Sequence, residues 1–166
     1  MSYITRAPKA FILDVDNTLL NTDAIKVFWT ETLKQKYKIK KVDFINAYKK
    51  SKVSAGYIDY DKLSGLIGVD RSFFHETPFK RFLFPNTIKA IQKLKKLGVV
   101  YIFSLGDPFY QKEKITKSGI EKTVGKNRVI ITQNKKLGLR SRLAILLCPF
   151  KHVDPPNFAG HTFTPA

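Results

Sequence analysis

The chain has 166 residues, of which 43% are hydrophobic and 13% aromatic, enough for one domain or for one core with an insertion. It carries 30 Lys and Arg against 13 Asp and Glu, a net charge of +17, which favours anionic partners such as nucleic acid or phosphorylated ligands. The single cysteine, Cys148, excludes an intrachain disulfide. Because no apolar stretch is long enough to span a membrane and the N-terminus lacks a signal-peptide core, we expect a cytoplasmic protein without a membrane partner.

The first predicted element is an apolar strand over residues 9–15, KAFILDV, of the kind that is buried in a parallel sheet. The apolar spacing then changes to a helical period and predicts three helices: 21–37, 42–52 and 60–67. Gly68 is expected to end the last of them. The segment DRSFFHETPFKRFLF predicts further helix, interrupted near Pro78.

Strands and helices alternate in the next part of the chain. The pattern predicts a helix over 85–97, a strand over 99–105, a helix over 107–118 and a strand over 128–132. Asp107 and Pro108 suit the N-cap and first residue of the second helix. Strand, helix, strand, helix, strand predicts an α/β fold with a parallel sheet. Beyond it, LAILLCPF fits a helix or a strand, and residues 151–166 are expected to be a loose tail.

Two carboxylates follow the first predicted strand, in the stretch FILDVDNT. In extended backbone, residues i and i+2 point to the same face, so Asp14 and Asp16 are expected side by side. Ligands of parallel sheets bind beyond the carboxyl ends of the strands, where these residues lie. Two adjacent carboxylates repel unless a cation lies between them, so the pair indicates a divalent metal site. An ordinary turn with Asx hydrogen bonds is the alternative interpretation.

The second strand ends in a small hydroxyl residue, Ser104. Gly106 follows and allows the backbone to approach a ligand closely. The hydroxyl and the neighbouring N–H groups, including that of Leu105, would suit a phosphate. Lys135 and Lys136 come after the third strand and could add a cation, although in so basic a chain they could equally be surface lysines. Ser104 could likewise be a strand-end hydroxyl without function, and Asp107 a helix cap.

The segment DVDNT resembles the first motif, DxDx[TV], of the haloacid dehalogenase (HAD) superfamily, and Ser104 resembles its second. FPNTIKAIQKLKKLGVVYIFSLGDPFYQKEKITKSGI is similar to the surroundings of that second motif in HAD phosphatases. The resemblance covers residues 9–136. It implies a HAD-like (Rossmannoid) parallel sheet core with a small helical cap inserted after the first strand. The implied division is a core over 1–20 and 84–150, a cap over 21–83 and a tail over 151–166.

The resemblance also implies roles for the two aspartates. Asp14 would be the nucleophile that forms an aspartyl-phosphate, and Asp16 would protonate the leaving group and then activate water. The Asp14 carboxylate and the Asp16 carbonyl would bind Mg²⁺. Dehalogenases of the superfamily lack an acid at the second position, so this pair implies phosphoryl transfer. The expected activity is hydrolysis of a phosphate monoester, with a phosphorylated small molecule as the substrate.

The resemblance assigns the other residues of the site to phosphate binding. Ser104, with Leu105 and Gly106, would hold the transferring phosphoryl group. Lys135 or Lys136 would neutralise the nucleophile and the phosphate.

The C-terminal part departs from the family pattern. The family's fourth motif supplies one or two acids after another strand, but Asp154 is the only acid after Lys136. It would be the third metal ligand beside Asp14 and Asp16. The motif is therefore degraded or missing, and the chain could be truncated. The alternative function is a catalytically impaired HAD-like domain that binds an acidic partner such as nucleic acid. The sequence gives no expectation for the oligomeric state.

Overall fold

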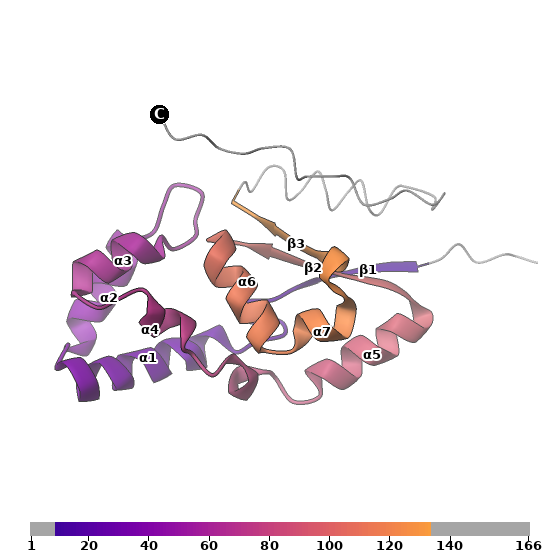
Figure 1. Cartoon of the computed structure of the whole chain (residues 1–166), viewed down its shortest axis with the longest axis horizontal. Helices are drawn as coiled ribbons and strands as arrows, with labels where there is room; N and C mark the ends of the chain where they lie inside the picture. Colours follow the sequence, from indigo (N-terminus) through magenta and orange to yellow (C-terminus); the bar gives the residue numbers. More distant parts are fainter. Residues whose placement is uncertain (1–8, 134–166) are drawn as a thin grey trace, which may run out of the picture.

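The computed structural model describes residues 9–133, and at their centre lies a three-stranded parallel sheet. Its strands are β1 (Lys9–Asp14), β2 (Gly98–Leu105) and β3 (Val129–Thr132), in the order β1-β2-β3 (Figure 1). Asp14 is in register with Phe103, and Leu105 with Thr132. The carboxyl ends of all three strands therefore meet at one edge of the sheet. This arrangement confirms the predicted parallel α/β fold.

Helices fill the two connections between the strands. The segment between β1 and α5 contains α1 (Thr22–Tyr37), α2 (Lys41–Lys50), α3 (Tyr60–Ile67), α4 (Ser72–His75) and the 3₁₀ helix η1 (Phe79–Phe82). The later helices are α5 (Thr87–Leu97), α6 (Pro108–Lys117), α7 (Ile120–Val124) and η2 (Lys126–Arg128). Pro78 separates α4 from η1, as predicted. The sequence did not indicate α7, because a five-residue helix between two glycines carries no clear period.

One hydrophobic cluster joins the sheet to the helices that follow it. On β2, Val100 and Ile102 are both fully buried and point to the same face of the sheet. They pack with Ile91 of α5, Ile115 of α6 and Val124 of α7. A fully buried aliphatic side chain contributes about 1.5–3 kcal/mol of hydrophobic free energy. This cluster therefore fixes α6, which follows Ser104, against the sheet.

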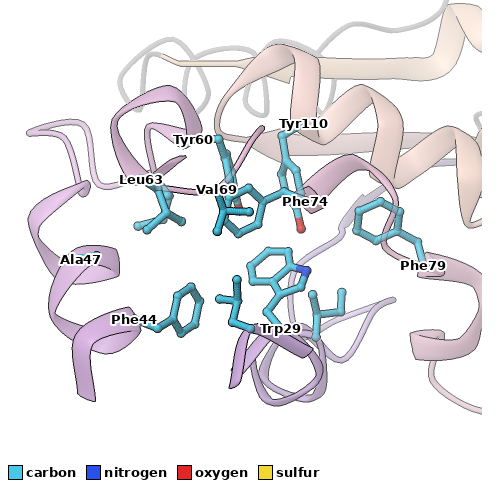
Figure 2. Packing of buried hydrophobic residues seen from close by; sticks show 12 residues of the cluster. Trp29, Phe44, Ala47, Tyr60, Leu63, Val69, Phe74, Phe79 and Tyr110 are labelled. Atoms are coloured by element: carbon cyan, nitrogen blue, oxygen red, sulfur yellow. The ribbon is translucent and has the colours of Figure 1, made fainter. Parts of the chain in front are cut away.

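A second, mainly aromatic cluster lies among α1–α4 (Figure 2). Its centre is Trp29 of α1, whose ring lies 5.0 Å from that of Phe74 and 6.1 Å from that of Tyr60. The Trp29 indole N–H donates a buried hydrogen bond of 2.7 Å to the Thr77 hydroxyl. Tyr110, from α6, also belongs to the cluster and stacks on Tyr60 at 4.0 Å and 26°. The cap helices are therefore packed onto α6 by aromatic contacts.

The two connections between cap and core run side by side. Leu20 and Leu83 form an antiparallel bridge, and the Asn21 N–H donates to the Phe82 carbonyl at 2.8 Å. These contacts lie at the predicted boundaries of the cap, residues 20–21 and 83–84. The division into core, cap and tail stays a prediction, since residues 134–150 and 151–166 lie outside the described residues. Within 9–133, no helix is long and apolar enough to cross a membrane.

Three tyrosines beside the cap provide a test of this packing by pH. Burial raises the pKa of Tyr48 to about 12, and it raises the pKa values of Tyr60 and Tyr110 well above the usual tyrosine range. A raised phenol pKa stabilises the fold below pH 10, and this contribution is lost as the pH rises towards 12. We expect the phenolate absorbance of these three residues to appear only above the usual tyrosine range, near pH 12 for Tyr48, together with loss of circular dichroism. Replacing Tyr48 by Phe should remove part of that late absorbance, and its persistence would contradict the assignment.

Candidate active site

The chain leaves β1 at Asp14 and turns sharply before α1. The Val15 carbonyl accepts hydrogen bonds from the N–H groups of Thr18, Leu19 and Leu20 at 3.0–3.3 Å. Asn17 adopts a left-handed conformation with φ 54°, which asparagine tolerates better than most residues. The turn places the side chain of Asp16 between the end of the sheet, the start of the cap and α6.

The carboxylate of Asp16 joins these three parts of the molecule. Its Oδ1 accepts hydrogen bonds of 2.6 Å from Thr22 Oγ1 of α1 and from Lys114 Nζ of α6. Its Oδ2 accepts one of 3.2 Å from Gln111 Nε2, also of α6. Asp16 therefore fixes the first turn of the cap and the inner face of α6 relative to the end of β1.

Burial alone would raise the pKa of Asp16, but the charge of Lys114 opposes this effect. Hydrogen bonds from Lys114, Thr22 and Gln111 act in the same direction, and together they hold the pKa of Asp16 below its ordinary value. The carboxylate is therefore ionised at neutral pH.

Sequence reasoning missed Lys114 and Gln111. Both are buried on the inner face of α6, which also carries Tyr110 and Ile115. Their position on the helix could have indicated them. Polar residues on the buried face of an amphipathic helix need a hydrogen-bond partner in the core. In the sequence they stand in the run QKEKITK, where lysines look like surface residues.

Ser104 lies where the sequence predicts it, at the end of β2. Its hydroxyl is fully buried and has no hydrogen-bond partner within residues 9–133. The Gln111 Oε1 is likewise buried without a partner in this part of the chain, while its Nε2 donates to Asp16 and to the Leu105 carbonyl at 3.2 Å each. Buried polar groups are rarely left unpaired, so these two groups suggest a ligand or an ordered water. Of the two residues, Gln111 lines the cleft described below, and Ser104 does not.

The structure corrects the expected role of the Gly106 backbone. Its N–H donates to the Thr132 carbonyl of β3 at 3.0 Å, so it is not a donor for a phosphate here. Gly106 contributes conformation instead, with φ 155°, and a Cβ at this position would lie 2.6 Å from Gln111 Nε2. The glycine therefore makes room for the amide that contacts Asp16.

This close approach predicts a destabilising Gly106→Ala substitution. An alanine would have to adopt an unfavourable φ and displace Gln111 from Asp16, and we expect a loss of about 1–3 kcal/mol in the free energy of unfolding. Urea denaturation measures it. Gly65→Ala is the matched control, because Gly65 lies within α3 with open space around it, and we expect it to stabilise by about 0.5–1 kcal/mol. Equal effects of the two substitutions would contradict this account.

A cleft of about 230 Å³ opens between the core and the cap at this point. The core side is formed by polar groups that include Asp16, Gln111 and Lys114. The cap side is formed mainly by Tyr48, Tyr57, Tyr60 and Lys26. A ligand in the cleft would therefore meet charged groups on the core side and tyrosine rings on the cap side.

Comparison with known proteins shows which fold builds this cleft. No protein-family model matches the sequence, and no curated protein matches it either. Among solved structures, a protein from Burkholderia xenovorans LB400 that is named a haloacid dehalogenase-like hydrolase is 24% identical with a TM-score of 0.69. The match covers 84% of this chain and 69% of that one. The chain has a haloacid dehalogenase-like fold.

Two further structures share this HAD-like fold. The HAD-hydrolase YfnB from Bacillus subtilis, bound to magnesium, has a TM-score of 0.52 at 16% identity, over 77% of this chain and 65% of that one. The L-2-haloacid dehalogenase from Xanthobacter autotrophicus with chloropropionic acid covalently bound has a TM-score of 0.51 at 12% identity. This match covers 84% of this chain and 65% of that one. At these identities the likeness establishes the fold, while the activities belong to those proteins.

The described residues of the HAD-like site provide some of the ligands that a magnesium ion needs. Asp14 and the main-chain carbonyl of Asp16 offer oxygen ligands, which Mg²⁺ prefers, and this ion commonly completes its shell with water and substrate phosphate. The Asp16 carboxylate is occupied by its three donors. Within residues 9–133, no group of three His, Cys, Asp or Glu side chains could hold a metal ion. The third predicted ligand, Asp154, lies outside the described residues, as do Lys135 and Lys136.

Asp107 is confirmed as the N-cap of α6, since its Oδ1 accepts a hydrogen bond of 2.8 Å from the Tyr110 N–H. It has a second partner that the sequence did not predict. Arg71 of the cap donates to both Asp107 oxygens at 3.0 Å and to both oxygens of Asp61 at 2.6–2.7 Å. Arg71 therefore ties the cap to the helix that carries Gln111 and Lys114.

A double-mutant cycle tests this connection. Asp107→Asn keeps an N-cap side chain but removes the charge, and Arg71→Met removes the guanidinium. Because both side chains are mostly buried, we expect a coupling free energy of about 1 kcal/mol from urea denaturation of the four proteins. Additive effects would mean that the contact does not hold the cap on α6.

Proposed function

We propose that this HAD-like protein is a hydrolase that removes phosphate from a small phosphate monoester. The observation that carries the proposal is the buried hydroxyl of Ser104, which has no partner within residues 9–133 and lies at the same sheet edge as Asp14. Neither residue lines the cleft itself, but the chain neighbours Leu105 and Asp16 do, together with Lys114. A phosphate offers the acceptor oxygens that such a hydroxyl and an ammonium group require. The ligands of open α/β sheets bind at this edge.

In the proposed reaction, an Asp14 carboxylate oxygen attacks phosphorus and the bond to the ester oxygen breaks. Water then attacks the aspartyl-phosphate and releases phosphate. The ester oxygen leaves with its electron pair and takes a proton from solvent. Asp16 is ionised, so it accepts the proton of the attacking water in the second step. Ser104 and Lys114 hold phosphoryl oxygens. Mg²⁺, held by Asp14 and the Asp16 carbonyl, would supply positive charge for the phosphoryl group.

The test compares two kinds of substrate on the full chain. Phosphate release from 4-nitrophenyl phosphate and chloride release from 2-chloropropionate are measured side by side, each with Mg²⁺ and with EDTA. We expect phosphate release that increases with Mg²⁺, and no chloride release. Chloride release without phosphate release would show dehalogenation in place of phosphate hydrolysis. If neither phosphate nor chloride is released, both activities are overturned.

A second candidate function is binding of an acidic partner such as nucleic acid. The observation that favours it is a shallow hollow of about 500 Å³ on α5, lined by Lys89, Lys93, Lys95 and Lys96 with Gln92. Several lysines on one helix face suit a phosphate backbone.

The test for this second function measures binding of a generic RNA oligonucleotide at increasing salt. We expect the affinity of the wild type for RNA to fall steeply as the salt concentration rises. At low salt, replacing Lys89, Lys93 and Lys96 by Gln should also reduce the affinity. A wild-type chain that fails to bind at low salt would overturn it.

A further inference from the structure

Lys114 is the most unusual residue of the site, because its side chain is 1% exposed while that of its partner Asp16 is 34% exposed. Lysine is almost never fully buried unless it is paired. We propose that Lys114 of α6 is the cation that binds the phosphoryl group in this cleft, shared between Asp16 and the ligand. This inference rests on the proposed function and adds a residue that the sequence assigned to no role.

Stability alone does not explain a lysine at this position. Moving an ammonium group out of water costs several kcal/mol, and an apolar side chain of similar volume is often as stabilising as a buried ion pair. Asp16 is partly in contact with solvent and already accepts hydrogen bonds from Thr22 and Gln111. Asp16 therefore does not need a buried cation to be solvated.

The hydrogen bonds of Lys114 leave room for a ligand. An ammonium group has three donors. Within residues 9–133 it makes one hydrogen bond, of 2.6 Å to Asp16 Oδ1, and its nitrogen lies 5.3 Å from the centre of the Tyr110 ring. Because Lys114 also lines the cleft, a phosphoryl oxygen there can accept one of the remaining protons.

The charges around the cleft require such a cation. A phosphate monoester is an anion, and it would approach the carboxylates of Asp14 and Asp16, both of which interact electrostatically with Lys114. The other lysine that lines the cleft within the described residues is Lys26. It belongs to the cap and is paired with Asp23 at 2.9 Å. Among the described lysines that line the cleft, Lys114 is therefore the one that contacts Asp16 and interacts electrostatically with Asp14.

The experiment measures phosphate binding without depending on turnover. Binding of inorganic phosphate and of orthovanadate to the full chain is measured by titration calorimetry for wild type, Lys114→Met and Lys112→Met. Lys112 is the matched control, since it lies on the same helix, is half-exposed and pairs with Glu121, and does not line the cleft. We expect Lys114→Met to weaken binding by at least about tenfold and Lys112→Met to leave it within about twofold, because of the two only Lys114 lines the cleft and can donate a charge-assisted hydrogen bond to phosphate.

Restoring the ammonium separates binding from a structural role. Lys114→Cys, alkylated with 2-bromoethylamine, regains a lysine-like side chain and should regain phosphate affinity, while wild type treated with the same reagent controls for Cys148. If Lys114→Met does not melt cooperatively, Asp16→Asn is compared with the Asp16→Asn and Lys114→Met double variant, which leaves no unpaired charge. We expect the double variant to bind phosphate more weakly than Asp16→Asn.

The outcomes distinguish this inference from the proposed function. Phosphate binding that depends on Lys114, without hydrolysis, would overturn the proposed function and support the inference. Hydrolysis with unchanged phosphate affinity in Lys114→Met, or in the double variant relative to Asp16→Asn, would overturn the inference alone. Loss of phosphate affinity in Lys135→Met or Lys136→Met, but not in Lys114→Met, would assign the cation to those residues instead.

Discussion

Replacing Asp14 by Asn should reduce the rate of phosphate release by at least about a thousandfold, the scale on which losing a nucleophile acts. The amide keeps the size of the carboxylate but is not a nucleophile for phosphorus, so no aspartyl-phosphate can form. Initial rates with 4-nitrophenyl phosphate measure the loss. Rapid quenching with hydroxylamine, followed by mass spectrometry, should detect a modified Asp14 in wild type only.

The control for this substitution is Asp43→Asn, which removes the same charge from the exposed surface of α2. It should leave the rate within about twofold, because a surface substitution away from special features has little effect. The thermal melt of Asp14→Asn should stay cooperative, so that a lost rate cannot be attributed to unfolding. Equal rates of phosphate release for Asp14→Asn and wild type would refute Asp14 as the nucleophile.

The largest effect on stability is expected from Phe74→Ala. Phe74 is fully buried at the centre of the cap, and its ring lies 5.0 Å from that of Trp29 and 5.2 Å from those of Tyr60 and Phe73 (Figure 2). Removing a buried ring loses its transfer free energy and leaves a cavity, at a cost of about 3–5 kcal/mol. This is a large part of the stability of an ordinary domain, which is about 5–15 kcal/mol.

Trp29 is the single tryptophan of the chain, so its fluorescence reports on the cap. Urea denaturation followed by fluorescence and by circular dichroism measures the effect of Phe74→Ala. Val27→Ala is the control, since Val27 is an exposed residue on the same helix as Trp29, and it should change stability by less than about 0.5 kcal/mol. A cost below about 1 kcal/mol for Phe74→Ala would show that the cap is not packed as described.

The aromatic cluster also affects how the site is held. Tyr110 is packed against Tyr60 and Trp29 on the cap side, and the same helix presents Gln111 and Lys114 to Asp16. If packing around Phe74 loosens, α6 loses part of its support. We therefore expect Phe74→Ala to weaken phosphate binding under conditions where the protein is still folded.

Much of the fold was predictable because the signals are local. Short apolar runs that end in Asp14 and Ser104 indicate parallel strands, and the structure confirms both, although β1 is only partly buried. Asp107 and Gly68 were predictable as helix ends because capping depends on a few neighbouring backbone groups. The resemblance of DVDNT to the HAD motif indicated the fold that the solved structures confirm.

The partner of the Gly106 N–H group could not be predicted from neighbouring residues. A glycine after a strand end suggested an N–H group available to phosphate, but that group is paired with the Thr132 carbonyl. The pairing depends on the register of β3, a strand that lies 23 or more residues further along the chain. No pattern within a few residues of Gly106 specifies that register.

Hydrophobic period and capping act over a few residues, so the order of the strands and of the longer helices, and the place of Asp14, Asp16 and Ser104 near strand ends, could be predicted from the sequence. Which side chains meet depends on the tertiary structure. Lys114 reaches Asp16 across 98 positions of the chain, and Arg71 reaches Asp107 across 36. Whether a lysine is buried beside a carboxylate or exposed to water depends on how α6 packs between the sheet and the cap, and that packing is set by side chains far apart in the sequence.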